Sequence, residues 1–237
     1  MSPANASTLV EFQGVTKVYS QGKVEVKALR GLDLTIHKGD FVAIWGPSGS
    51  GKTTALNLIG ALDAPTSGTL RLEGKDLGTM SRRALSVMRR DRIGFVFQAY
   101  NLIPVLSAYE NAESVMALQG KPAAERKARV MGLLKDVGLE GLENRRPHEM
   151  SGGQQQRVAI ARAIASNPAV VLADEPTANV DSETSEKLLK LMADLNNDHG
   201  VTFIFSTHDP RVMKYAKRLV GLVDGKVASD VLKEQGQ

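Results

Sequence analysis

The chain has 237 residues, of which 42% are hydrophobic and 24% are charged, and this balance excludes a disordered or collagen-like chain. The length is sufficient for one large domain or for a domain with an inserted lobe. Thirty Lys and Arg residues against 26 Asp and Glu give a formal net charge of +4, an excess that does not by itself indicate nucleic acid as a partner.

The absence of cysteine and of long apolar runs indicates the cellular compartment. The sequence has no cysteine, which is typical of a reducing compartment and excludes disulfide and thiol chemistry. No apolar run approaches the ~18 residues of a membrane-spanning helix, and residues 1–10 lack the pattern of a signal peptide. We therefore expect a cytosolic chain that leaves any membrane spanning to another polypeptide. Basic segments at 81–92 and 121–130 carry interleaved apolar residues, which favours solvated helix faces over a nucleic acid site.

Through residue 98 the hydrophobic pattern predicts strands and helices in alternation. Apolar runs and period-two alternation predict strands at 9–12, 32–37, 41–46, 69–74 and 93–98. Longer periodic segments predict helices at 52–63 and 81–92.

From residue 99 to residue 167 the strand signals stop. The pattern there predicts helices at 108–120, 123–139 and 150–165, and strands resume at 169–174 and 201–206 around a helix at 182–200. A hairpin follows at 218–229, with its turn at Asp224-Gly225. We predict an α/β fold: a P-loop NTPase core with a mostly parallel sheet, an N-terminal antiparallel β part and an inserted α-helical lobe. The whole of 1–237 is then one domain, with its core at 1–98 and 168–237 and the lobe at 99–167.

Residues 46–53 read GPSGSGKT between a predicted buried strand and a predicted helix, and they match the phosphate-binding loop pattern in full. Glycines let several backbone N–H groups point at phosphate oxygens, and the helix that follows adds its positive end. Lys52 is expected to reach the β- and γ-phosphates, and the Thr53 hydroxyl to bind Mg²⁺. The residues of this stretch predicted to bind nucleotide are Gly46, Pro47, Ser48, Gly49, Ser50, Gly51, Lys52, Thr53 and Thr54.

Four polar residues at strand ends complete the predicted catalytic site. Asp174 and Glu175 follow a buried strand, at the edge where open α/β sheets bind ligands. We expect Asp174 to hold Mg²⁺, directly or through water, and Glu175 to polarise an attacking water. Gln98 and His208 end two further strands at the same edge, where Gln98 could bind Mg²⁺ or sense its water and His208 could donate to the γ-phosphate.

Residues 150–165 read MSGGQQQRVAIARAIA, a helical pattern that begins on Ser151, Gly152 and Gly153. Ser151 is suited to cap the helix, but glycine is a poor helix former, so we interpret the two glycines as a backbone that something approaches closely. Free N–H groups and the helix dipole make such a start an anion site. Because the lobe would carry Ser151 away from Lys52, two anion sites predict a symmetric head-to-tail pair, each chain completing the γ-phosphate site of the other.

These motifs, in their order and spacing, resemble the nucleotide-binding subunit of ABC transporters over essentially the whole chain. The resemblance rests on GPSGSGKT, Gln98, MSGGQQQR, VVLADEP, ANVD and His208. It implies that Tyr19 stacks on adenine, that Gln154 belongs to the site at the helix start, and that Asp181 of ANVD contacts the partner's site. The catalytic residues that it implies are Lys52, Gln98, Glu175 and His208.

The resemblance also implies a function. The chain is expected to be an ATP-hydrolysing subunit that uses ATP and Mg²⁺ and dimerises around two nucleotides, with a second copy or with a different cassette. It is expected to drive a separate membrane permease, which contacts the helical lobe and residues 99–110. Such a subunit lies in the cytoplasm, peripherally on the inner membrane. Stretches at 26–68 and 92–112 resemble the subgroup of lipoprotein release and of macrolide or peptide export. Met150, Val180 and Thr54 depart from the usual motif residues but keep their size or chemistry, so an active ATPase is expected.

An ABC-type ATPase of a non-transport complex is the alternative. Members in DNA repair carry a long coiled coil before the signature stretch, and members in translation carry two cassettes in one chain, neither of which this sequence has. Complexes of cell division or of iron-sulfur assembly remain open. The partners in iron-sulfur assembly are soluble, so copurification with a membrane permease would exclude that alternative.

Overall fold

The computed structural model describes residues 7–22 and 24–233, and its centre is a six-stranded sheet in the order β10-β9-β3-β8-β7-β6. The five strands from β9 to β6 run parallel, and β10 pairs antiparallel with β9 across the predicted turn at Asp224-Gly225. The strands of this sheet are β3 (Phe41–Trp45), β6 (Ile93–Val96), β7 (Val170–Asp174), β8 (Phe203–Thr207), β9 (Arg218–Val223) and β10 (Lys226–Leu232).

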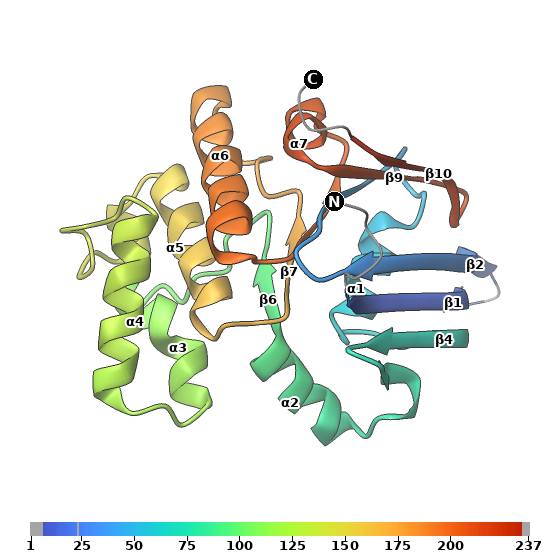
Figure 1. Cartoon of the computed structure of the whole chain (residues 1–237), viewed down its shortest axis with the longest axis horizontal. Helices are drawn as coiled ribbons and strands as arrows, with labels where there is room; N and C mark the ends of the chain where they lie inside the picture. The colour runs from blue at the N-terminus through green and yellow to red at the C-terminus, as the bar shows by residue number, and fades with distance from the viewer. Residues whose placement is uncertain (1–6, 23, 234–237) are drawn as a thin grey trace.

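A second, antiparallel sheet in the order β2-β1-β4-β5 lies at one side of the first (Figure 1). Its strands are β1 (Thr8–Gln21), β2 (Val24–His37), β4 (Ser67–Leu72) and β5 (Lys75–Asp76). The long β1–β2 ribbon is much longer than the strands predicted at 9–12 and 32–37. Register shifts along the pair interrupt the alternation of apolar and polar residues. Near the tip of the ribbon, Val24 and Val26 are 63% and 45% exposed, so burial does not impose a period-two pattern on the sequence there.

Seven helices and two short 3₁₀ turns complete the described part of the chain. They are α1 (Lys52–Ile59), η1 (Leu77–Thr79), α2 (Arg82–Arg92), α3 (Ala108–Leu118), α4 (Ala123–Asp136), η2 (Pro147–Glu149), α5 (Gly152–Ala165), α6 (Ser182–His199) and α7 (Pro210–Tyr215). The prediction of a helix to residue 63 was wrong, because α1 ends at Gly60 and Ala61 then adopts a left-handed φ of 51°. The short helix α7 was not predicted, since six residues carry too little periodicity.

Alternate side chains of the central strands belong to two different apolar cores. Phe41 and Ala43 of β3 pack with α3 to α7, whereas Val42 and Ile44 of the same strand pack with α1 and the antiparallel sheet. A parallel sheet covered on both faces requires strands that are buried on both faces, and these runs meet that requirement. Consequently α1 and α5 lie on opposite faces of the sheet.

The predicted lobe contains α3, α4 and α5, which lie together beyond β6 (Figure 1). All described residues from 99 to 167 are helical or irregular, as the sequence predicted. The helix α5 packs so closely on the sheet that a Cβ added to Gly94 of β6 would lie 2.3 Å from the Ala163 carbonyl oxygen. The helices therefore share one apolar core with the sheet, and the division into a core and a lobe stays a prediction.

Candidate functional site

The glycine-rich loop lies between β3 and α1, at the carboxyl edge of the parallel sheet. At two positions of the loop the surrounding atoms leave no room for a side chain, so glycine is required. Gly46 has φ 150° and an added Cβ would lie 2.2 Å from the Leu222 carbonyl oxygen, and Gly51 has φ 102° with Ala28 O at 2.6 Å from such a Cβ. Only glycine allows this backbone to curl between β9 and β2.

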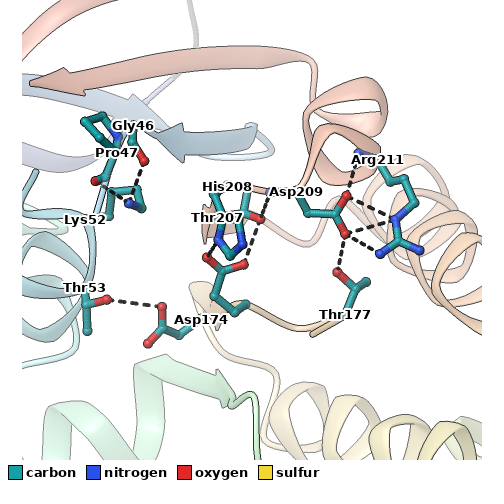
Figure 2. A network of polar contacts seen from close by, with 11 residues as sticks. Gly46, Pro47, Lys52, Thr53, Asp174, Thr177, Thr207, His208, Asp209 and Arg211 are labelled. Carbon is teal, nitrogen blue, oxygen red and sulfur yellow. Dashed lines mark hydrogen bonds and ion pairs between the residues drawn. The ribbon is translucent and has the colours of Figure 1, made fainter. Parts of the chain in front are cut away.

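Lys52 begins α1, and its ammonium group lies inside the curl of the loop. Its Nζ donates to the carbonyl oxygens of Gly46 at 2.8 Å and Pro47 at 3.0 Å, as Figure 2 shows. The residue is 9% exposed, so a charge that is costly to bury is held by two fixed acceptors. An ammonium so placed is oriented for an anion at the loop.

Thr53 and Asp174 face each other across the edge of the sheet. The Thr53 hydroxyl points at Asp174 Oδ1, at 3.5 Å (Figure 2). Burial is the main cause that raises the pKa of Asp174 above its ordinary value, and the charge of Glu175 adds to it. A hydroxyl and a half-buried carboxylate are the hard oxygen donors that Mg²⁺ takes, and the buried Ser50 hydroxyl of the glycine-rich loop has no hydrogen-bond partner among the described residues. The donor set thus fits a magnesium nucleotide.

Glu175 is held in a strained backbone conformation directly after β7. Its φ is 45°, in the left-handed region that side chains rarely adopt. Its N–H donates to the Ser206 carbonyl oxygen, and its carboxylate accepts from the Thr207 hydroxyl at 3.0 Å and lies 2.6 Å from Nδ1 of His208. A strained backbone persists only where surrounding bonds hold it in place. Such residues cluster at functional sites.

The segments after β7 and β8 are tied together by a second set of bonds. Asp209 accepts from the Thr177 hydroxyl at 3.0 Å and pairs with Arg211 at 2.8 Å, as Figure 2 shows. Buried Gln156 of α5 donates to the Pro176 carbonyl oxygen at 2.6 Å. These contacts fix the backbone directly after Glu175 and join it to the segment after β8. The sequence did not predict a role for Thr207, Asp209 and Gln156, whose only signal is their place beside the motif residues.

Gln98 lies two residues beyond the end of β6 and is exposed, so the predicted strand was two residues too long. Its carbonyl oxygen accepts from Nδ2 of Asn179 at 2.9 Å. The structure thus joins the segment after β6 to the segment after Glu175, while the role of the Gln98 side chain stays a prediction.

Ser151 caps α5 as predicted. Its hydroxyl accepts from the Gln154 N–H, and Gln154 Oε1 accepts from the Ser151 N–H, which forms a capping box. The glycines have partners within the chain: an added Cβ would lie 2.7 Å from Tyr100 Oη at Gly152 and 2.4 Å from Thr184 Cγ2 at Gly153. Close internal packing therefore accounts for glycine at both positions, and an anion site across a pair of chains stays a prediction.

Tyr19 and Asp181 were assigned through the resemblance, and both have bonds within the chain. The Tyr19 hydroxyl donates to Asp63 Oδ2 at 3.0 Å, and the ammonium of Lys17 lies 4.9 Å from the centre of its ring. Asp181 accepts from the Thr184 N–H at 2.9 Å and so caps α6. Neither arrangement tests the predicted contacts with adenine or with a partner chain.

A model of the family described as "ABC transporter" matches residues 29–178, which is more than half of the chain. Among curated relatives, a lipoprotein-releasing system ATP-binding protein, LolD, of Anaeromyxobacter dehalogenans is 45% identical over 97% of this chain and 97% of its own length. A macrolide export ATP-binding/permease protein, MacB, of Marinobacter nauticus is 45% identical over 94% of this chain. The chain spans about a third, 34%, of the length of that MacB.

A solved structure supports the same assignment. The ATP-binding cassette MJ0796, described as a dimeric post-hydrolysis state bound to ADP and Pi, is 43% identical and superimposes with a TM-score of 0.86. The match covers 94% of this chain and 98% of that one. A curated protein of the same name, from Methanocaldococcus jannaschii, is an ABC transporter ATP-binding protein with 45% identity.

Proposed function

The chain belongs to the ABC transporter family, and from this premise we propose that it binds and hydrolyses ATP to drive a separate membrane permease. Lipoprotein release and macrolide export are the transport processes that the named relatives favour. Among residues 7–22 and 24–233, no helix combines the length and hydrophobicity needed to cross a bilayer. We infer that the chain works on the cytoplasmic face of the inner membrane, held there by the permease.

The arrangement around Glu175 carries the proposal. Its carboxylate is fixed by Thr207 and His208 at the same edge of the sheet as Lys52 and Asp174. We infer that Glu175 accepts the proton of the attacking water, that Lys52 holds the transferred phosphate, and that His208 donates to it. Thr53, Asp174 and Gln98 would hold Mg²⁺, which neutralises phosphate charge when it is bound.

A pair of chains would complete the site. The capping box of α5 leaves the N–H groups of its first residues, Gly152 and Gly153, without partners in the helix itself. Since α5 and α1 lie on opposite faces of the sheet, we propose that the start of α5 meets the phosphate loop of a second copy. The dimeric state described for the MJ0796 cassette supports a homodimer.

The permease is proposed to dock beside the segment 99–110. A mainly apolar hollow of about 390 Å³ adjoins this segment, and its lining includes Leu62, Phe95, Phe97, Val115 and Leu118 as well as Arg89, Arg90 and Arg162. Its size and apolar lining suit the apolar face of a short amphipathic helix, which is the occupant we propose.

Two experiments test the proposed function. The first follows the fluorescence of Trp45, the single tryptophan of the sequence and the neighbour of Gly46, during ATP titration, together with phosphate release. Lys52→Ala should abolish both signals, and Lys187→Ala, which removes an exposed lysine of α6, should leave them unchanged. Normal ATP affinity in Lys52→Ala would contradict the role of the loop.

The second experiment tests the permease contact. The chain has no cysteine, so Val105→Cys, at a position 72% exposed in the docking segment, introduces the single thiol. It should crosslink to the copurified permease, whereas Val231→Cys, at a position 52% exposed on β10, should not. Crosslinking from position 231 alone would place the contact elsewhere.

A further inference from the structure

The two residues Tyr100 and Asn101 hold an unusual backbone shortly after Gln98. Their φ angles are 57° and 49°, both in the left-handed region. Arg162 of α5 stabilises this turn, because its Nη2 donates to the Tyr100 carbonyl oxygen at 2.9 Å and its Nη1 to that of Asn101 at 2.6 Å. The segment after Gln98 is therefore fixed to α5.

The side chain of Tyr100 closes a ring of hydrogen bonds. Its hydroxyl donates to the Asn179 carbonyl oxygen at 2.9 Å, and Nδ2 of Asn179 donates to the Gln98 carbonyl oxygen at 2.9 Å. Burial raises the pKa of Tyr100, so its hydroxyl keeps the proton that this bond needs. The segment after Gln98 and the segment after Glu175 are thus joined twice.

The Tyr100 hydroxyl also leaves no room for a Cβ at Gly152, the first residue of α5. A Cβ added at Gly152 would lie 2.7 Å from Tyr100 Oη, but 3.6 Å from Tyr100 Cζ and from the Asn179 carbonyl oxygen. The Cβ of an alanine at position 152 would therefore collide with the hydroxyl, whereas the next nearest atoms lie at ordinary contact distance. Tyr100 could give way only by leaving Asn179.

We propose that Tyr100 is a positioning residue that links three segments of one chain: the segment at Gln98, the segment at Asn179 to Asp181, and the start of α5. This inference rests on the proposed ATPase function. Tyr100 acts through the backbone of its neighbours. A displacement of Gln98 at the γ-phosphate would reach, through Tyr100, the two segments that are proposed to face the second copy.

Removal of the hydroxyl alone tests this link. Tyr100→Phe keeps the ring and loses the bond to Asn179, so kcat for ATP should fall about tenfold while KM changes less than about twofold. The melting temperature should stay within a few degrees. The control is Tyr215→Phe, which removes the hydroxyl of a partly buried tyrosine on α7, outside the three linked segments and the docking segment, and it should leave kcat unchanged.

A suppressor experiment isolates the contact with Gly152. Gly152→Ala should lower kcat more than Tyr100→Phe does, and the double variant should recover to the level of Tyr100→Phe, because the colliding oxygen is gone. Gly153→Ala should gain nothing from Tyr100→Phe, since its close neighbour is Thr184. A double variant at 152 no better than Gly152→Ala alone would overturn the link.

The two proposals fail in different ways. Absence of ATP hydrolysis in the unmodified chain, with and without its permease, would refute the proposed function. Hydrolysis by the unmodified chain with the same kcat in Tyr100→Phe would refute the role of Tyr100 alone.

Discussion

Glu175 and His208 meet at 2.6 Å, through Oε1 of the carboxylate and Nδ1 of the imidazole, although 33 positions separate them in the sequence. The other carboxylate oxygen accepts from the Thr207 hydroxyl at 3.0 Å. These bonds and the left-handed backbone at Glu175 fix its side chain in one orientation. A base held in this way loses little entropy when it meets its water.

Glu175→Gln should therefore separate binding from hydrolysis. The amide keeps the size of the side chain and an acceptor for Thr207, but it cannot accept the proton of a water. We expect ATP affinity within a few fold of the unmodified chain and turnover lower by about 10²- to 10⁴-fold. Phosphate release and Trp45 fluorescence measure the two effects, and an unchanged turnover would exclude Glu175 as the base.

Asp174→Asn should stabilise the nucleotide-free chain at neutral pH. Because burial raises the pKa of Asp174, the folded state binds its proton more tightly than the unfolded state, so stability falls as pH rises above the ordinary value of about 3.9. Replacement by the neutral amide should raise the melting temperature at pH 7 by about 2–4 °C. The gain should disappear near pH 4, where Asp174 is protonated, and a gain that is equal at both pH values would contradict this origin.

Tyr19→Ala tests the proposed contact with adenine. Loss of a stacked aromatic ring should weaken ATP binding by about 5- to 150-fold, the equivalent of one stacked base. Tyr19→Phe keeps the ring and loses only the bond to Asp63, so its affinity should stay close to that of the unmodified chain. Titration with ATP compares the three proteins, and full affinity in Tyr19→Ala would place the base elsewhere.

Gly94→Ala and Gly132→Ala form a matched pair that tests the packing of α5 on the sheet. At Gly94 an added Cβ would lie 2.3 Å from a backbone oxygen of α5, so the substitution should destabilise the chain by about 1–3 kcal/mol or more. At Gly132, inside α4, nothing lies within 4 Å of such a Cβ, and alanine should stabilise by about 0.5–1 kcal/mol. Urea unfolding measures both, and equal effects would contradict the close approach.

The sequence predicted the parallel core because its strands are short apolar runs bounded by strong turn signals. The same reasoning failed where burial is partial. The exposed ribbon around Val24 and Val26 carries no clear period, and the end of α1 depends on a left-handed Ala61 that composition does not reveal. Helix starts at Ser107 and Ser151 were easier to predict, because a capping box is local chemistry.

The candidate site was predicted wherever a motif carries its own chemistry, as at Lys52 and Asp174. Its supporting residues were not, because their contacts join distant positions: Gln156 reaches Pro176, and Tyr100 reaches Asn179. Gly152 shows most clearly what could not be predicted from the sequence. Its residue type suggests an approaching anion, but within the chain the neighbour that excludes a side chain is a tyrosine hydroxyl.

We propose that two chains complete one site, and sedimentation velocity of Glu175→Gln is the test of this claim. With ATP and Mg²⁺ this variant should sediment as a dimer, and without nucleotide as a monomer. Adding Ser151→Asp keeps a good helix cap but places a negative charge where the partner's γ-phosphate would lie, so this double variant should bind ATP and stay monomeric. A Glu175→Gln chain that binds ATP stoichiometrically and remains a monomer would contradict the claim.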